Sequence, residues 1–164
     1  MPEKKTIQRE RNARRQGKAP SSQAGEFVRE EMHHIRRGKH GARSTKQAIA
    51  IGLSKARRAG VALPPPKKGR VSEKTRKSAL TAQAAGQGRR RRGSTRRSRA
   101  TERALKREGR SAASRQALSR QARTAAQKRT RAERSASARR AARTKGARRR
   151  SAAAKKAART RAHR

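Results

Sequence analysis

The sequence has no cysteine, aspartate, tryptophan or tyrosine, and its one aromatic residue is Phe27. Without cysteine, disulfides, thiolate zinc sites and cysteine nucleophiles are excluded. A single aromatic side chain cannot form the stacking platform on which single-stranded nucleic acid binds. No apolar run of about 18 residues occurs, so no membrane span is expected. The first residues, Met1–Lys5, lack the apolar segment of a secretory signal.

Large apolar side chains are also scarce. Only 15 of the 164 residues are Ile, Leu, Val, Met or Phe, because alanine dominates the hydrophobic 29%. Burying one such side chain contributes about 1.5–3 kcal/mol, whereas ordering one residue costs about 1–2 kcal/mol of backbone entropy. Fifteen large apolar side chains are too few to form a hydrophobic core for the whole chain. The composition therefore predicts a mostly α, largely disordered protein with one small folded region.

Positive charge is abundant: 52 Lys and Arg oppose 9 Glu, giving a formal net charge of +43. Residues 1–63 hold eleven of the large apolar residues and 16 Lys and Arg, whereas residues 64–164 hold four and 36. The prolines at 64–66 mark the change and predict a stiff spacer. The expected organisation is a basic N-terminal helix or arm (1–19), a small helical head (20–63), a Pro-rich linker (64–70) and a basic tail (71–164).

Three helices are expected before the prolines, over about residues 3–16, 22–37 and 45–59. Val28, Met32 and Ile35 recur at helical spacing, and Ser44 with Gln47 has capping-box spacing. The short loop after Gly38 predicts a hairpin of the second and third helices. Its core would comprise Phe27, Val28, Met32, Ile35, Ile49, Leu53, Val61 and Leu63. A core of this size is marginal, which leaves a homodimer through the head open.

The tail is of low complexity, and residues 139–144 recur in altered form at 155–160. Alanine, arginine, lysine and glutamine are good helix formers. Like charges three or four residues apart oppose the helix in free solution, and phosphate would remove this opposition. The tail is therefore expected to be conditionally helical: disordered when free and helical when bound.

This charge distribution predicts sequence-tolerant binding of DNA that neutralises phosphate charge and compacts or bridges duplexes. No zinc-finger, basic-zipper or RNA-recognition motif is present. We expect the contacts to come from Lys and Arg in both parts of the chain. The candidate DNA-binding residues are Lys39, Arg43, Lys46, Lys55, Arg57, Arg58, Arg89, Arg90, Arg91, Arg92, Arg139, Arg140, Arg148, Arg149, Arg150, Lys155 and Lys156.

Two resemblances agree with this prediction. Residues 23–32 (QAGEFVREEM) and 38–60 (GKHGARSTKQAIAIGLSKARRAG) resemble a family of small basic bacterial proteins of unknown function, over about residues 1–69. Some members are loosely labelled DNA-binding, but the family offers no catalytic or binding residues to transfer. The Lys/Arg/Ala-rich tail resembles the tails of linker histones and of bacterial histone-like proteins. The resemblance of the head implies a bacterial protein, and because the sequence shows no export signal, a cytoplasmic, nucleoid-associated location is expected.

Other function classes are weighed against this prediction. An RNA- or ribosome-associated basic protein is the main alternative, because charge alone does not select DNA. A membrane-active cationic protein is disfavoured because the tail has almost no large apolar residue to insert. No enzyme and no cofactor are expected, since no nucleophile–base set or cofactor loop occurs.

Specific sites in the head are weighed in the same way. No metal site is expected at His33, His34 and His40, because the surroundings are cationic and no Cys or Asp assists; they are interpreted as surface or loop residues. The glutamates at 26, 30 and 31 are expected to interact favourably with the helix dipole near the N-terminus of the second helix, or to neutralise nearby arginines. The loop 38–45 precedes a helix N-terminus and is open to phosphate contact. A helix-turn-helix-like unit, with residues 44–58 as the recognition helix, stays an alternative.

Overall fold

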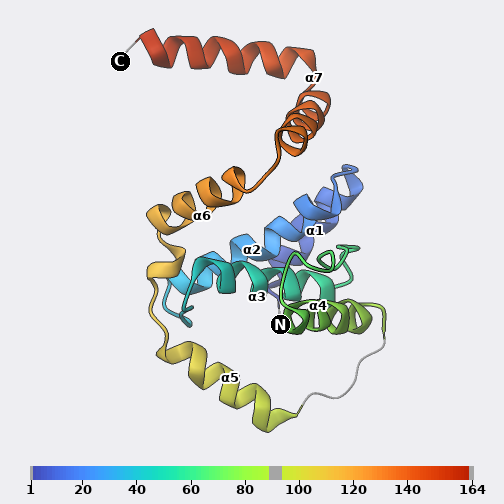
Figure 1. Cartoon of the computed structure of the whole chain (residues 1–164), viewed down its shortest axis with the longest axis vertical. Helices are drawn as coiled ribbons and strands as arrows, with labels where there is room; N and C mark the ends of the chain where they lie inside the picture. The colour runs from blue at the N-terminus through green and yellow to red at the C-terminus, as the bar shows by residue number, and fades with distance from the viewer. Residues whose placement is uncertain (1, 89–93, 163–164) are drawn as a thin grey trace. The chain divides into compact units, whose positions relative to one another are not determined.

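Figure 1 shows the computed structural model of the chain, which describes residues 2–88 and 94–162, with only the backbone at 144, 145 and 147–150. The chain divides into two compact units, Met1–Gln121 and Ala122–Arg164. The described residues form α1 (Lys4–Arg15), α2 (Pro20–Arg36), α3 (Thr45–Arg58), α4 (Glu73–Gly86), α5 (Thr95–Arg107), the short 3-10 helix η1 (Ser111–Ala113), α6 (Arg115–Gln127) and α7 (Arg131–Ala162).

The prediction of a largely disordered chain with a conditionally helical tail is wrong, because α4 to α7 make the tail helical. Local signals explain the difference. A serine or threonine hydroxyl accepts a backbone N–H at the start of each helix, a cap that contributes about 0.5–2 kcal/mol. Repulsion between two like charges on a helix costs only about 0.2–0.5 kcal/mol. The capping pairs are Ser72 with Thr75, Ser94 with Arg97, Ser114 with Ala117, and Thr130 with Glu133.

The three helices expected before the prolines are confirmed as α1, α2 and α3. The predicted cap at Ser44 also forms: Ser44 Oγ accepts the Gln47 N–H at 3.2 Å, while Gln47 Oε1 accepts the N–H of Arg43, one residue before the cap, at 2.8 Å. Glycines at positive φ follow each helix, at Gly17, Gly38 and Gly60, in the left-handed conformation typical of helix C-termini. These end signals explain why the sequence pattern located the helices well.

The hairpin of α2 and α3 is antiparallel, and all eight expected core residues take part. Phe27 and Ala24 of α2 pack with Ala56 of α3 and with Val61, while Met32 and Ile35 pack with Ala48 at the other end. Gly52 makes the crossing close, since a Cβ there would lie 2.7 Å from the Cα of Val28. Helix α1 packs against α2.

The tail contributes to the same core. Ala112 and Ala113 of η1 are buried against Met32 and Ile35, and Leu118 of α6 packs beside them. Three side-chain and backbone contacts hold η1 in place: the Thr45 hydroxyl donates to the Ala112 carbonyl at 2.7 Å, Arg36 Nε donates to the Ala113 carbonyl at 2.8 Å, and the Ala42 N–H donates to the Gly109 carbonyl at 3.1 Å. Residues 105–118 thus complete the head.

Helix α4 also packs on the head, against α3. Ala79 and Ala82 are its buried residues, and Gly86 lies so close to the Arg57 carbonyl that a Cβ would collide with it. The prolines at 64–66 therefore connect two packed helices, and the first compact unit continues past them to Gln121.

The second unit consists of the end of α6 and the whole of α7. Gly146 breaks α7 with a φ of 66° and a ψ of 166°, so the element is two helical segments joined by a kink. The two copies of the imperfect repeat, 139–144 and 155–160, lie on either side of this glycine. Where the structure describes its side chains, α7 has none that is buried.

Candidate functional site

Exposed Lys and Arg side chains occur on both segments of α7, before and after Gly146, where the structure describes the side chains. We call the following residues the α7 cationic surface: Arg131, Arg134, Arg139, Arg140, Arg143, Lys155, Lys156, Arg159 and Arg161, all of which are exposed. Successive residues of a helix are about 100° apart. Arg139, Arg140 and Arg143 therefore point away from Arg131 and Arg134, and the charge surrounds the helix axis instead of forming one stripe.

The candidate residues of the tail divide into three groups. Arg139, Arg140, Lys155 and Lys156 belong to the α7 cationic surface. The backbone of Arg148, Arg149 and Arg150 lies in α7, but their side chains lie outside what the structure describes. The run Arg89, Arg90, Arg91 and Arg92 lies outside the described residues altogether.

Among the candidates in the head, Arg43, Lys46 and Arg58 are exposed, as expected for residues that contact phosphate. Arg43 Nε lies 3.7 Å from Oε1 of Glu108. An exposed pair of this kind contributes little and is readily exchanged for another partner. These three side chains are available to an anionic ligand.

Arg57 is not directed outward. The residue is only 7% exposed, and its guanidinium donates to the Leu63 carbonyl at 3.3 Å and to the Pro64 carbonyl at 3.1 Å. Burial lowers the pKa of the Arg57 guanidinium, because desolvation disfavours the charged form. Its position identifies Arg57 as the residue that fixes the chain leaving α3, so the expectation that it faces DNA is corrected.

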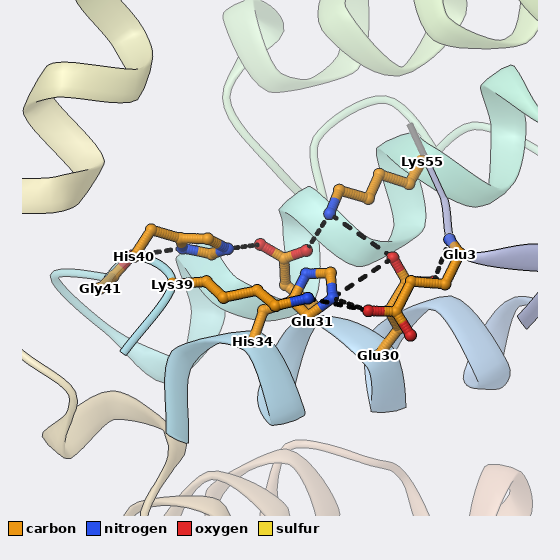
Figure 2. Close-up of polar contacts among 8 residues, drawn as sticks. All are labelled: Glu3, Glu30, Glu31, His34, Lys39, His40, Gly41 and Lys55. Carbon is orange, nitrogen blue, oxygen red and sulfur yellow. Dashed lines mark hydrogen bonds and ion pairs between the residues drawn. The ribbon is translucent and has the colours of Figure 1, made fainter. Parts of the chain in front are cut away.

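Lys39 and Lys55 are engaged by carboxylates (Figure 2). The exposed Lys39 Nζ donates to Glu3 Oε1 at 2.9 Å, and the half-buried Lys55 Nζ donates to Glu31 Oε2 at 2.5 Å. Glu30 lies beside them, with Oε1 4.0 Å from Lys55 Nζ. We call Glu3, Glu30 and Glu31 the carboxylate cluster. Lys55, like Arg57, is an internal partner and not an outward-facing cation.

The expectation that Glu30 and Glu31 interact with the dipole of their helix is also corrected. Helix α2 begins at Pro20, so Glu30 and Glu31 lie well beyond its first turn and do not stabilise its N-terminal dipole. Both are buried, at 4% and 0% exposure. One feature of the sequence indicates this network, namely the i,i+4 spacing of Glu30 and His34, whose Oε1 and Nε2 atoms lie 3.9 Å apart.

Glu3 joins α1 to this network. Its Oε1 accepts from His34 Nε2 at 2.8 Å as well as from Lys39, and its N–H donates to Glu30 Oε2 at 3.2 Å. The hydrogen bonds from His34 and from Lys39, that from His34 foremost, lower the pKa of the Glu3 carboxyl to about 2. Sequence reasoning missed Glu3, because it lies 27 residues before Glu30 and no local pattern connects the two.

Part of the loop 38–45 is engaged by the protein itself. The Gly41 N–H donates to the Leu105 carbonyl at 2.8 Å and the Ala42 N–H donates to the Gly109 carbonyl at 3.1 Å, so these two amides are not offered to a phosphate. Gly41 is also in contact with the Glu108 carbonyl, where a Cβ would collide. The helix-turn-helix alternative loses support as well, because α4 packs against α3. In addition, two of the four Lys and Arg residues of α3, Lys55 and Arg57, are hydrogen-bonded within the protein.

Comparison with known proteins agrees with the head's resemblance at the family level. Residues 15–68 match a model described as a family of unknown function, DUF6496. The likeness of the tail to histone tails has no such support. No curated protein and no solved structure matches the chain. In the part of the chain that the structure describes, no helix is both long enough and apolar enough to cross a membrane.

Proposed function

We propose that this protein is a non-enzymatic, histone-like architectural protein that binds duplex DNA without sequence readout, neutralises its phosphates and bridges or compacts it. Under this proposal it associates with the nucleoid of a bacterial cell. The observation that supports the proposal most is the α7 cationic surface, in which every Lys and Arg with a described side chain is exposed.

The charge density of α7 suits a duplex. Its 32 residues contain 13 Lys and Arg and one Glu. Their helical length is about 48 Å, and a duplex of that length carries about 28 phosphates. Cations all around the axis let one helix contact phosphates of two duplexes at once, which is the geometry that bridging requires.

Readout of bases has no comparable support. Phe27 is the only Phe, Tyr or Trp residue and is fully buried in the head, so no aromatic side chain of these three types is available to stack on a base. Arginine can contact guanine, but cations that surround a helix meet phosphate irrespective of sequence. We therefore favour duplex DNA over single-stranded RNA as the ligand.

The proposal is tested by the salt dependence of binding to random duplex DNA, measured by fluorescence anisotropy with the full chain. We expect a steep linear fall of log K against log salt. Substituting Arg139, Arg140, Lys155 and Lys156 together by Gln should reduce the slope by about 3–4, at about 0.9 per lost phosphate contact. Substituting Arg139 and Arg140 by Lys is the matched control and should leave the slope unchanged.

Two outcomes would overturn the proposal. A slope that the four Gln substitutions leave unchanged would mean that α7 does not contact the backbone. If structured RNA displaces the duplex at equal salt and equal phosphate concentration, the alternative of an RNA- or ribosome-associated protein is correct instead. Bridging is checked separately, by the co-sedimentation of a labelled with an immobilised duplex.

A further inference from the structure

A group of ionisable side chains in the first unit has no part in the proposed function. Glu31 and His34 of α2 and His40 of the following loop each offer a ligand atom, and these atoms all lie within 4.8 Å of one another. Figure 2 shows the Glu31 carboxylate between the two imidazoles, whose ring centroids are 6.2 Å apart. Glu31 and His34 are buried and His40 is half-buried.

The hydrogen bonds of His40 leave a lone pair facing Glu31. Its Nδ1 lies 3.1 Å from the Gly41 carbonyl oxygen, which only accepts, so we assign a proton to Nδ1. In the neutral ring Nε2 then carries a lone pair. That atom lies 3.1 Å from Glu31 Oε1, which also only accepts. Two lone pairs at this distance repel each other unless a cation joins them, either a second proton on His40 or a metal ion.

His34 is oriented in the same way. Its Nε2 lies 2.8 Å from the Glu3 carboxylate, so Nε2 carries the proton and the neutral ring keeps a lone pair on Nδ1. Histidines that bind metals regularly donate their other N–H to a carboxylate or to a backbone carbonyl, which fixes the ring. His34 has the first kind of partner and His40 the second.

Glu31 supplies the remaining ligand atom. Its Oε2 accepts from Lys55, but its Oε1 is buried and has no hydrogen-bond partner among the described residues. A buried carboxylate oxygen without a partner is costly. The i,i+3 spacing of Glu31 and His34 is also the spacing with which helical bundles bring a carboxylate and an imidazole to one metal ion.

We propose that Glu31, His34 and His40 bind one divalent transition-metal ion, for which Zn²⁺ is the best candidate. Two imidazoles and one carboxylate are ligands that Zn²⁺ accepts, with the fourth position left to water. The ion ties the loop that follows α2 back to that helix, where the loop contacts residues 105–109. Its role is therefore structural.

The cationic surroundings, from which the sequence predicted no metal site, do not oppose the ion as that prediction assumed. Lys55 and Lys39 are held by Glu31 Oε2 and by Glu3, so two carboxylates already compensate their charges. The carboxylate of Glu30 is buried next to them. With neutral imidazoles, three carboxylates and two lysines leave the site one negative charge before the ion binds.

The test is a titration of the full-length, EDTA-treated protein with Zn²⁺ at pH 7.5, in competition with a chromophoric chelator. We expect one ion per chain and a rise in Tm, because an ion that binds only the folded state stabilises it. His40→Ala should weaken the affinity by at least about 100-fold, since the loss even of an outer partner costs about 10–100-fold. The matched control is His33→Ala, which removes an exposed histidine of α2 and should change nothing.

A second probe protects the test against a misfolded variant. Co²⁺ should give the visible absorption of a four-coordinate site in the unmodified protein and in His33→Ala, and lose it in His34→Ala and His40→Ala. The absence of stoichiometric binding to the unmodified protein would overturn the proposal and assign the cation at His40 to a proton. Equal losses in His33→Ala and His40→Ala would also overturn it, since binding would then be to surface histidines.

Discussion

Met1–Gln121 and Ala122–Arg164 are both helical, yet different forces hold their helices. Every large apolar residue of the chain lies at or before Leu118, so the second unit has none. The first unit is stabilised by two buried clusters between α2, α3 and η1. The described part of α7 has no buried side chain and depends on alanine propensity and on its cap. Packing is thus required where chain segments must be positioned, and propensity is enough where charge must only be displayed.

Arginine has a different role in each of the two units. Arg57 lies in the first unit, 7% exposed, and binds two carbonyl groups. Arg139 lies in the second and is exposed. Net charge therefore overstates the surface available to a polyanion, because part of the positive charge of the first unit is used to hold its own chain together.

The largest effect that separates the two units should come from Phe27→Ala. Phe27 is fully buried, and such a truncation costs about 3–5 kcal/mol. We expect the cooperative unfolding transition of the first unit to shift to much lower denaturant concentration. Ala136→Gly in α7 is the control: it costs about 1 kcal/mol of local helix stability and should not move that transition. Equal shifts for the two variants would show that the units do not differ in this way.

Two helical glycines provide the next comparison. A Cβ at Gly52 would meet the Cα of Val28 at 2.7 Å, so Gly52→Ala should destabilise the hairpin by about 1–3 kcal/mol. At Gly25 nothing lies within 4 Å of the added atom, and Gly25→Ala should stabilise α2 by about 0.5–1 kcal/mol. Chemical denaturation gives both signs, and a destabilising Gly25→Ala would contradict the packing described for α2.

Much of the head could be predicted from sequence. Helix ends follow from Ser44 and from glycines at positive φ, and the eight apolar residues of the hairpin core follow from helical spacing. These signals are local or repeat along one helix face. Ala112, Ala113 and Leu118 could not be assigned to that core, because they lie in a low-complexity segment far along the chain.

The tail and the buried ionic site show where sequence reasoning failed. The prediction of a disordered tail rests on the scarcity of large apolar side chains and on repulsion between like charges, and it is wrong because it leaves out the caps at Ser72, Ser94 and Ser114. The network of Glu3, His34 and His40 depends on the docking of α1 and on one loop conformation. Neither leaves a periodic pattern, so the histidines were interpreted as surface residues.

Adjacent arginines sharpen the comparison within one helix. Arg57→Gln should destabilise the first unit by about 1–2 kcal/mol, because the Leu63 and Pro64 carbonyls lose a charged donor. Its affinity for duplex DNA should stay unchanged. Arg58 is exposed, so Arg58→Gln should change the free energy of unfolding by no more than about 0.5 kcal/mol and slightly weaken DNA binding. The reverse pattern, measured by melting and anisotropy, would place Arg57 at the ligand.

The smallest expected effect tests whether α7 depends on local signals. Thr130 Oγ1 accepts the Glu133 N–H at 3.1 Å, and Glu133 Oε2 accepts the Thr130 N–H at 3.0 Å, which together form a capping box at the start of α7. Thr130→Ala should cost about 0.5–1 kcal/mol of helix stability. The loss should appear as faster amide exchange in the first turns of α7, with no change in the unfolding transition of the first unit. Thr130→Ser retains the hydroxyl and should exchange as the unmodified protein does. If Thr130→Ala exchanges no faster, the helix is held by something other than its own sequence, and the contrast between a packed unit and a locally stabilised one fails.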